Sequence, residues 1–358
     1  MPLRCIIAAL VPPETEIPVK ILIVRVSSLG DVVHNMPMLA DIARHHPDAQ
    51  IDWVVEEAYA DLVRLNVHVR EVIPIALRRW RRSLGAAATR AEIGAFYRRL
   101  RRDAYDLVFD TQGLLKTGIV MRLARLAPGG RRVGLANATE GSGYEPLSRL
   151  FHSQSIGVGR RTHAVARARL VAAGALGYAV GTPADFGLRA PLTEGPAPAW
   201  LPSQPYAVFF HATARAAKQW PVSHWVRIGQ LLAARGWPIL LPWGNPAERQ
   251  AAEALAAQLP NARVLPALPM MEAVLLAQRA ALAIGVDTGL THIAAAYCRP
   301  TVELYCDSPR WKTEGDWAPQ IVNLGELGAP PSVAQVEEAL ARLLERWTAS
   351  EDVMVQSN

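Results

Sequence analysis

The chain of 358 residues is poor in cysteine, and this scarcity excludes two kinds of stabilised fold. Its cysteines are Cys5, Cys298 and Cys306, too few and too scattered for a disulfide framework. No Cys-x-x-Cys pair or Cys/His cluster has the spacing of a zinc site. The pattern fits a protein of a reducing cytosol, and we predict no metal site.

Three motifs of common enzyme classes are also missing. The turn after the first expected strand lacks Gly-x-Gly-x-x-Gly, and Gly-x-x-x-x-Gly-Lys-Ser/Thr occurs nowhere. These absences argue against a nicotinamide dehydrogenase and a P-loop nucleotidase. No Gly-x-Ser-x-Gly occurs either, so the sequence offers no serine nucleophile elbow.

Long apolar runs are absent. No stretch approaches the ~20 residues that span a bilayer, so we expect any membrane contact to be peripheral. The first eleven residues faintly resemble a signal peptide, but this short run meets Pro12-Pro13 without a clear cleavage site. We interpret residues 1–18 as an extension before the first strand.

Positive charge is in excess. The chain has 38 Lys and Arg against 32 Asp and Glu, a net charge of +6. Such a balance favours an anionic partner: nucleic acid, a membrane surface or a phosphorylated substrate. Nucleic acid is disfavoured because no RNA- or DNA-binding module is recognisable. The length and a hydrophobic share of 51% predict two domains with a large core.

The order of the expected elements describes an α/β protein with two similar halves. In the first half we expect strands at 20–26, 50–55, 71–75, 105–109 and 132–135, and helices at 32–44, 91–102, 116–126 and 163–173. In the second half we expect strands at 206–210, 238–241, 281–286 and 301–305, a strand remnant at 264, and helices at 225–235, 247–258, 270–278, 293–296 and 333–347. This alternation predicts parallel sheets covered on both faces.

A proline-rich segment separates the halves. Five prolines fall between residues 188 and 205, which indicates a linker. We therefore divide the chain into the extension at 1–18, a first domain at 19–187, the linker at 188–205, a second domain at 206–330, and a C-terminal helix and tail at 331–358. Two such domains joined by a hinge imply a cleft between them.

Polar residues that follow the strands are the candidates for chemistry, because ligands of parallel sheets bind beyond the carboxyl ends of the strands. They are Ser27, Ser28, Gly30 and Asp31; Glu56 and Glu57; Asp110 and Gln112; Thr213 and Lys218; Trp243, Gly244 and Glu248; and Asp287, Thr288, Gly289 and His292. The set contains carboxylates, one lysine and one histidine.

The stretch at 280–296 combines an apolar strand, the turn Asp287-Thr288-Gly289 and a helix of small residues. It has two interpretations. One is an ordinary strand-to-helix turn whose aspartate caps the helix. The other is a seat for a diphosphate, because a helix N-terminus presents free N–H groups and the positive end of its dipole.

Asp31 and Lys218 each have two interpretations as well. Asp31 could cap the helix after the first strand or act as a general base that faces the cleft. Lys218 lies close to a helix N-terminus, a poor place for a cation unless it pairs with a phosphate. Otherwise it is a solvated surface lysine.

Two arginine clusters lie in the first half. One surrounds Trp80, and the other falls in the helix expected at 91–102. The clusters comprise Arg78, Arg79, Arg81 and Arg82, and Arg98, Arg99, Arg101 and Arg102. They form either a solvated basic face or a surface for phosphates and anionic lipid headgroups.

Together these residues resemble the bacterial lipopolysaccharide heptosyltransferases of glycosyltransferase family 9. The resemblance covers about residues 19–347. Its specific segments are 27–31, 53–57, 78–81, 110–114, 211–213 with 218–221, 241–244 and 287–292. His-Ala-Thr at 211–213 and Trp-Val-Val-Glu-Glu at 53–57 favour the type I members over type II, which add the second heptose.

The resemblance implies a GT-B fold, in which two Rossmann-like, doubly wound domains face each other across a cleft. The first domain would bind the acceptor and the second the ADP-heptose donor. The implied reaction transfers L-glycero-D-manno-heptose, with inversion and without a metal or other cofactor, to the first Kdo of Kdo–lipid A. The enzyme would act peripherally at the cytoplasmic face of the inner membrane, on an anionic surface.

The resemblance also implies roles for individual residues. Asp31 would be the general base, and Lys218 would stabilise the departing ADP. The implied donor site comprises Thr213, Ala214, Lys218, Glu248, Leu268, Asp287, Thr288, Gly289 and His292. The implied acceptor site comprises Ser28, Gly30, Arg78, Arg79, Arg81, Arg82 and Gln112.

The chain departs from the family pattern at three positions. Ala214 stands where a second threonine is frequent, Leu268 where methionine is usual near the adenine, and Tyr144 where arginine is usual. Two alternatives remain: a type II enzyme, and a non-catalytic module that binds a sugar nucleotide or a lipid. Intact Asp31 and Lys218 argue against the module.

Overall fold

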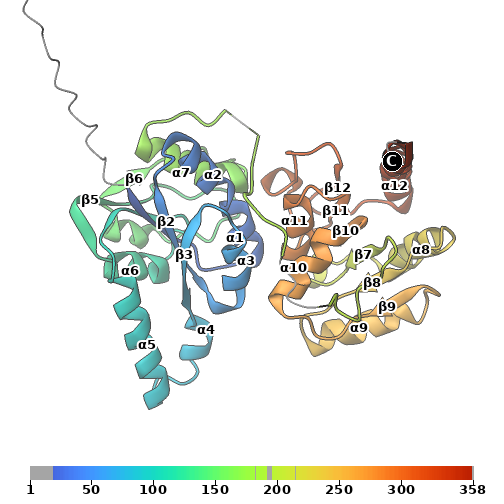
Figure 1. Cartoon of the computed structure of the whole chain (residues 1–358), viewed down its shortest axis with the longest axis horizontal. Coiled ribbons are helices and arrows are strands. Elements are labelled where there is room, and N and C mark those ends of the chain that lie inside the picture. Colours follow the sequence, from blue (N-terminus) through green and yellow to red (C-terminus); the bar gives the residue numbers. More distant parts are fainter. Residues whose placement is uncertain (1–18, 182, 192–195, 214, 357–358) are drawn as a thin grey trace, which may run out of the picture.

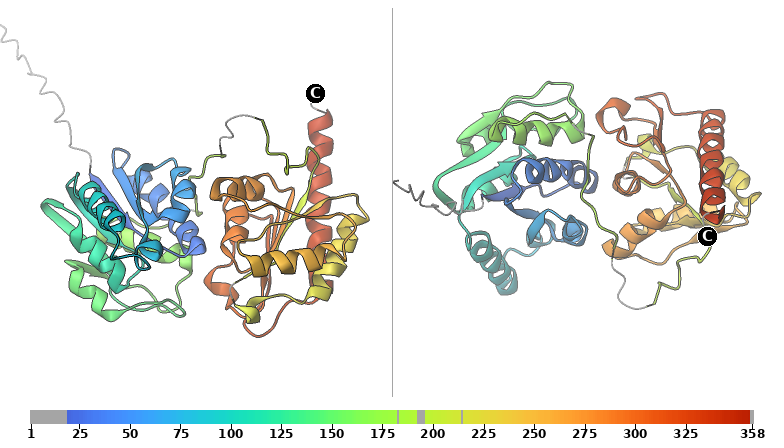
Figure 2. Two further views of the ribbon diagram at one scale, coloured as in Figure 1. Left: turned by 90° about the horizontal axis from the view of Figure 1, so that it is seen from below. Right: turned by 45° about the horizontal axis from the view of Figure 1, so that its top comes forward.

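Two α/β units lie side by side, each with a six-stranded parallel sheet covered by helices (Figures 1 and 2). The computed structural model describes residues 19–181, 183–191, 196–213 and 215–356, with side chains to residue 345. The extension expected at 1–18 lies outside the described residues. Within the described part of the chain, no helix is long and apolar enough to cross a membrane.

The first unit holds six parallel strands in the order β3-β2-β1-β4-β5-β6. Its strands are β1 (Lys20–Val24), β2 (Gln50–Glu56), β3 (Val69–Ile75), β4 (Tyr105–Asp110), β5 (Leu126–Leu135) and β6 (Gln154–Ile156). The central β1 is almost continuously apolar and buried, because helices cover both of its faces.

The helices of the first unit connect these strands. They are α1 (Leu29–Asn35), α2 (Pro37–His45), α3 (Ala60–Arg64), α4 (Leu77–Trp80), α5 (Ala87–Leu100), α6 (Leu115–Leu123) and α7 (Ala164–Leu176), with short 3₁₀ turns η1 (Glu57–Tyr59) and η2 (Pro146–Phe151). Each strand-to-strand crossover therefore carries the chain back across a face of the sheet.

The second unit repeats the arrangement of the first, with strand order β12-β11-β10-β7-β8-β9. Its strands are β7 (Ala207–Phe210), β8 (Ile239–Leu241), β9 (Ala262–Val264), β10 (Leu282–Val286), β11 (Thr301–Tyr305) and β12 (Ile321–Gly325). Its helices are α8 (Val222–Ala233), α9 (Pro246–Ala256), α10 (Met270–Arg279), α11 (Gly289–Ala296) and α12 (Val333–Gln356), with 3₁₀ turns η3 (Ala216–Lys218) and η4 (Arg310–Lys312).

The C-terminal helix α12 packs on the second unit. Val336, Leu340 and Leu343 recur at helical spacing and are buried in the core that the second sheet shares with α8. Ser332 and Gln335 cap its start reciprocally: the Ser332 N–H donates to the Gln335 side chain, and the Gln335 N–H donates to Ser332 Oγ.

Most expected elements are present, with corrections at their bounds. The helix expected at 32–44 is two helices, because Pro37 has no N–H to continue the first and starts the second. The helix expected at 293–296 begins at Gly289. Four elements were not expected from the sequence because they are short or mixed in polarity: β6, β12, α3 and α4.

The two units meet at the N-termini of α1 and α11. A side chain at Gly289 would collide with Leu29, and a Cβ at Gly30 would lie 3.1 Å from the His292 ring. Gly30 lies inside α1 without a positive φ. The small size of Gly30 therefore serves the close approach of the two helices rather than a turn of the backbone.

Candidate active site

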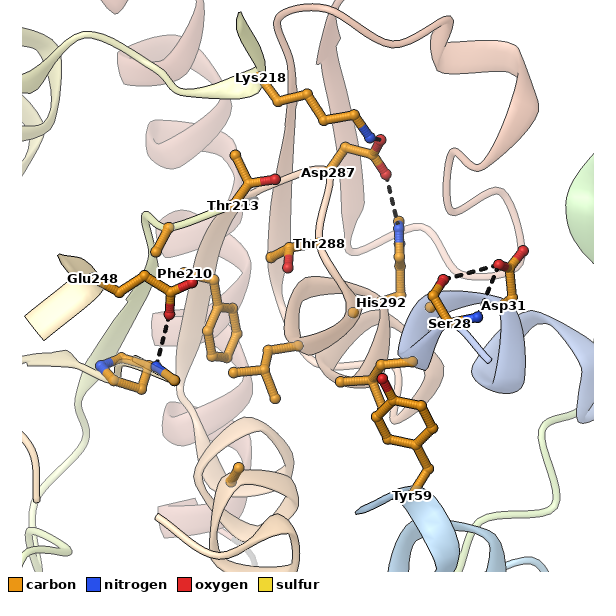
Figure 3. Close-up of a pocket in the computed structure, with 18 of the residues that line it drawn as sticks. Ser28, Asp31, Tyr59, Phe210, Thr213, Lys218, Glu248, Asp287, Thr288 and His292 are labelled. Carbon is orange, nitrogen blue, oxygen red and sulfur yellow. Dashed lines mark hydrogen bonds and ion pairs between the residues drawn. The ribbon is translucent and has the colours of Figure 1, made fainter. Parts of the chain in front are cut away.

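A single cavity of about 780 Å³ lies between the two units and receives the carboxyl ends of β1, β7 and β10. Both sheets reverse their strand order next to these strands, which is where parallel sheets form crevices. Many predicted residues line the cavity (Figure 3): Ser28, Gly30, Asp31, Arg78, Thr213, Lys218, Glu248, Leu268, Asp287, Thr288, Gly289 and His292.

Asp31 caps its helix and also faces the cavity, and its role as a general base stays a prediction. Its Oδ2 accepts from the N–H and the hydroxyl of Ser28, at 3.2 and 2.8 Å, and so closes the first turn of α1. Its Oδ1 lies 2.6 Å from an Arg25 guanidinium nitrogen and 3.8 Å from one of Arg167. The side chain remains 37% exposed toward the cavity. A helix-capping carboxylate is thus also open to a substrate.

The arginines set the charge state of this carboxyl group. Burial by itself would raise the pKa of Asp31, but the positive charges of Arg25 and Arg167 and the bonds from Ser28 outweigh it. The pKa of Asp31 therefore lies well below its ordinary range, and the group is ionised at every pH near neutrality.

Across the cavity, Asp287 is held between two cations at the end of β10 (Figure 3). Its Oδ2 is ion-paired with the Lys218 ammonium group, and its Oδ1 lies 3.1 Å from His292 Nε2. Burial would raise the pKa of Asp287, but these bonds outweigh burial and hold it well below its ordinary range. Lys218 is therefore neither a solvated surface lysine nor free of protein partners.

His292 is a buried cation. Its Nδ1 lies 3.1 Å from Glu303 Oε1, so a protonated ring donates to a carboxylate on each side. Burial opposes this charge, but the bonds to Asp287 and Glu303 outweigh it and raise the pKa of His292 to about 10. The His34 ring, with its centroid 4.4 Å away, is also buried, and burial and the charge of His292 lower the pKa of His34.

We predict that the charge of His292 makes stability fall as the pH rises. Its folded pKa of about 10 exceeds the ordinary value of 6.5, so its stabilisation is complete below about pH 6.5 and is lost as the pH passes 10. When the pH is raised from 7 to 10.5, the melting temperature of wild type should fall by a few degrees more than that of His292→Gln. The size of this difference follows from the usual relation between unfolding free energy and melting temperature for domains of this size, roughly a few degrees per kcal/mol. Parallel curves of melting temperature against pH for the two proteins would contradict a charged His292. The control is His224→Gln, which changes a histidine outside this network and should follow wild type.

The far end of the cavity is formed by α9 and the loop after β8. Glu248 Oε2 accepts from the Gly244 N–H at 2.7 Å, and Asn245 caps α9 by accepting from the Glu248 N–H at 3.0 Å. Phe210, Leu268 and other apolar groups line this end. A carboxylate beside apolar walls is suited to a nucleoside. Its ribose hydroxyl groups can donate to Glu248, and its flat base can pack against the apolar walls.

Several predicted residues lie outside the cavity lining. Arg79 is ion-paired with Glu57 and Glu92, and exposed Arg81 and Arg82 follow it. Gln112 accepts from the Val26 N–H through its side chain at 3.1 Å, so it supports the chain between β1 and α1. Ala214 lies outside the described residues. Direct contact of these five positions with an acceptor or donor stays a prediction.

Two arginines of the second cluster are also held by carboxylates. Arg99 and Arg102 are ion-paired with Glu71, and Arg101 lies over the Tyr97 ring. Tyr144, at the position where an arginine is usual, packs its ring against Gly113 and donates to the Leu135 carbonyl at 3.3 Å. It is not among the residues that line the cavity.

The sequence did not single out five residues of the site. Tyr59, His34 and Lys312 line the cavity, whereas Arg25 and Arg167 stand behind Asp31. Arg25 lies one residue past β1, and a charged residue directly after a central strand could have been predicted as part of the site. Arg167 and Lys312 follow no motif. Arg167 reaches the site through the packing of α7 on α1, and Lys312 through the packing of the two units.

Comparisons with known proteins agree on one family. The sequence model of glycosyltransferase family 9 (heptosyltransferase) matches residues 93–341. Lipopolysaccharide heptosyltransferase 1 of Pseudomonas aeruginosa is 41% identical over 290 residues, which cover 80% of this chain and 78% of that protein. The protein of that name from Escherichia coli K12 is 39% identical over 289 residues, covering 80% and 87% of the two chains.

Solved structures agree as well. A structure of the E. coli heptosyltransferase WaaC with ADP has a TM-score of 0.77 and 34% identity, covering 90% of this chain and 99% of that one. E. coli ADP-heptose lps heptosyltransferase II, at 21% identity and a TM-score of 0.72, shares the fold.

These matches confirm the family resemblance and the GT-B type of α/β fold predicted from the sequence. Of the segments that carried the resemblance, those at 27–31, 211–213 with 218–221, 241–244 and 287–292, together with Arg78, contribute residues to the cavity lining. The chain is a glycosyltransferase and belongs to glycosyltransferase family 9, the heptosyltransferases.

Proposed function

We propose that the chain moves L-glycero-D-manno-heptose from ADP-heptose to the first Kdo of Kdo–lipid A, in a single inverting displacement. One observation carries the proposal: Asp31 of the first unit and the Lys218–Asp287 pair of the second face the same cavity. A WaaC structure with ADP-2-deoxy-2-fluoro heptose, at 33% identity and a TM-score of 0.72, supports the donor.

The second unit supplies the groups that an ADP-sugar requires. The first turn of α11, at Thr288 and Gly289, presents backbone N–H groups and the positive end of the helix dipole toward a diphosphate. Lys218 can keep Asp287 and still donate to a phosphate oxygen, because an ammonium group has three N–H donors. Glu248 would accept from a ribose hydroxyl beside the apolar end of the cavity.

The first unit supplies the base. As the diphosphate departs, positive charge grows on the sugar ring, and the carboxylate of Asp31 stabilises it. The acceptor hydroxyl becomes acidic as its oxygen bonds to the anomeric carbon, so a weak base such as Asp31 suffices to take the proton. Attack from the side of Asp31, opposite the departing ADP, inverts the anomeric centre.

Release of ADP from defined substrates tests the proposal. Purified protein with ADP-heptose should release ADP rapidly with Kdo–lipid A and slowly with an acceptor that already carries the first heptose. No ADP release with either acceptor would leave a binding module, and preference for the second acceptor would indicate type II activity. Either result would sink the proposed reaction.

An apolar and basic surface on the first unit is suited to the membrane that holds such an acceptor. Leu115, Ile119 and Leu123 recur every four residues on α6 and are at least 36% exposed, although the opposite face of α6 is buried. Leu147 and Leu150 of η2, 60% and 79% exposed, extend this stripe, because η2 packs on α6 with its Phe151 ring against Gly118. We call these five residues the α6–η2 patch.

The charge around the α6–η2 patch complements anionic lipid. Lys116, Arg122 and Arg149 are exposed on the same two elements, whereas the exposed acid there, Glu145, accepts a bond from the Leu115 N–H. Helix α6 lies on the side of the first unit that is away from the second (Figure 1). We propose that the patch rests on the cytoplasmic face of the inner membrane and holds the acceptor-binding unit near its lipid-anchored substrate.

We predict that Leu147→Glu with Leu150→Glu lowers binding to vesicles of phosphatidylglycerol and phosphatidylcholine by at least ~10-fold, since burying one leucine contributes ~1.5–3 kcal/mol. Co-sedimentation measures this binding. The matched control is Val222→Glu with Leu327→Glu, two side chains of similar exposure on the second unit. Equal losses of binding in both double variants, or no binding by wild type, would refute the placement of the patch on the membrane. The activity of Leu147→Glu with Leu150→Glu on a water-soluble acceptor should stay unchanged.

A further inference from the structure

The ammonium group of Lys312 stands in the cavity, and none of the carboxylates that the structure describes is bonded to it. Lys312 lies at the end of η4 and is half-buried, and its Nζ donates to a neutral oxygen, the Gly141 carbonyl of the first unit. The other lysine of the cavity, Lys218, is paired with Asp287. A half-buried cation that is bonded to a neutral group is stabilised when an anion binds to it.

Contacts across the unit boundary hold Lys312 in this place. The Arg161 guanidinium lies 4.9 Å from the centre of the Trp311 ring, and His163 Nε2 lies 2.9 Å from the Glu314 carbonyl oxygen. The residues on both sides of Lys312 are therefore anchored to the first unit. Lys312 is part of the donor-binding unit in the sequence, but its ammonium group lies at the acceptor side of the cavity.

Positive charge is in surplus at this corner. Arg25, Arg167 and Lys312 surround one carboxylate, that of Asp31. Burial lowers the pKa of Lys312, and the charges that face it, in order of strength, are those of Asp31, Arg167, Asp287 and Lys218. Because the oxygen that accepts its hydrogen bond, the Gly141 carbonyl, belongs to the first unit, the ammonium group is assigned to the acceptor rather than to the leaving diphosphate.

We infer that Lys312 binds the carboxylate of the acceptor sugar acid and so places the attacking hydroxyl beside Asp31. This inference rests on the proposed function, because Kdo is an acidic sugar that carries a carboxylate. It gives the donor-binding unit a direct contact with the acceptor, so the acceptor would bridge the two units. Recognition needs one charge-assisted hydrogen bond, N⁺–H to carboxylate oxygen, in a partly desolvated cavity.

Steady-state kinetics with two water-soluble acceptors test the inference. One is de-acylated Kdo–lipid A, and the other is the same molecule with its Kdo carboxylates reduced to alcohols. For Lys312→Met, kcat/KM on the first acceptor should fall by ~10–100-fold, the range of a hydrogen bond to a charged group. On the reduced acceptor the variant should stay within about 3-fold of wild type. Lys312→Arg, which keeps the cation, should recover most of the loss.

The outcomes separate the possible sources of the effect. An equal loss by Lys312→Met on both acceptors would overturn the inference, as would a matching loss of affinity for ADP measured by calorimetry. Unchanged ADP affinity shows that the variant is folded, and Lys20→Met, which changes a half-buried lysine outside the cavity, is the matched control. The proposed function fails separately, if wild type turns over neither acceptor.

Discussion

Replacing Asp31 with asparagine should lower kcat by ~10²–10⁴-fold while ADP binds with unchanged affinity. Asparagine preserves the shape of the side chain and can still accept from Ser28, so α1 keeps its first turn. An amide cannot take the proton of the acceptor hydroxyl, and it presents no negative charge to the cationic sugar ring. Rapid-quench measurement of heptosyl transfer, with calorimetry for ADP, gives both quantities.

Asp41 supplies the control for Asp31. It forms a buried, two-point ion pair with Arg169, at 2.6 and 2.9 Å, and does not line the cavity. Asp31→Asn and Asp41→Asn both leave an arginine without its charged partner, so both should lower the melting temperature. Only Asp31→Asn should lose kcat. A turnover near that of wild type for Asp31→Asn would remove Asp31 as the base.

The low pKa of Asp31 adds a pH criterion. A depressed folded pKa means that the carboxylate stays ionised as the pH falls, until that low pKa is reached. Between about pH 5 and 8, therefore, protonation of Asp31 should not reduce kcat. An acid limb in this range that disappears in Asp31→Asn would show that the pKa in the working enzyme is much higher.

The second large effect is expected for Lys218→Met, with a fall in kcat of ~10²–10³-fold. Methionine keeps the length of the apolar stem but removes the charge that would stabilise the departing diphosphate. It also removes one of the two cations that hold Asp287, and His292 remains as the other. Because negative charge grows on the leaving group in the transition state, kcat should fall more than ADP affinity.

Lys20 offers a matched lysine away from the site. Its ammonium group is 2.9 Å from Asp103, and it does not line the cavity. Lys20→Met should leave kcat within a few-fold of wild type, with at most a small loss of stability. If Lys218→Met changed neither turnover nor donor affinity, its role toward the diphosphate would be refuted.

The polar residues that follow strands were predictable because strand order and site position are linked. An apolar strand such as β1 or β10 can be predicted from its residues. The carboxyl ends of central parallel strands lie close together, so the residues that follow them share one site. Asp31, Lys218 and Asp287 were therefore found from sequence alone. They line one cavity, as a GT-B fold requires.

The partners of those residues were not predictable, because they come from other elements. Arg167 lies far from Asp31 in the chain and reaches it only when α7 packs on α1. Lys312 depends on how the two units meet. The need for a small residue at Gly30 arises from His292 of the other unit. Such residues are specified by tertiary contacts, which a local pattern does not encode.

The anomeric configuration of the new glycosidic bond tests the central claim most directly. In a single displacement, the hydroxyl beside Asp31 attacks the face opposite the diphosphate at Lys218. Nuclear magnetic resonance of the product formed from ADP-heptose and de-acylated acceptor should show the configuration opposite to that of the donor. Retention of the donor configuration would require a covalent or front-face route and would contradict the account.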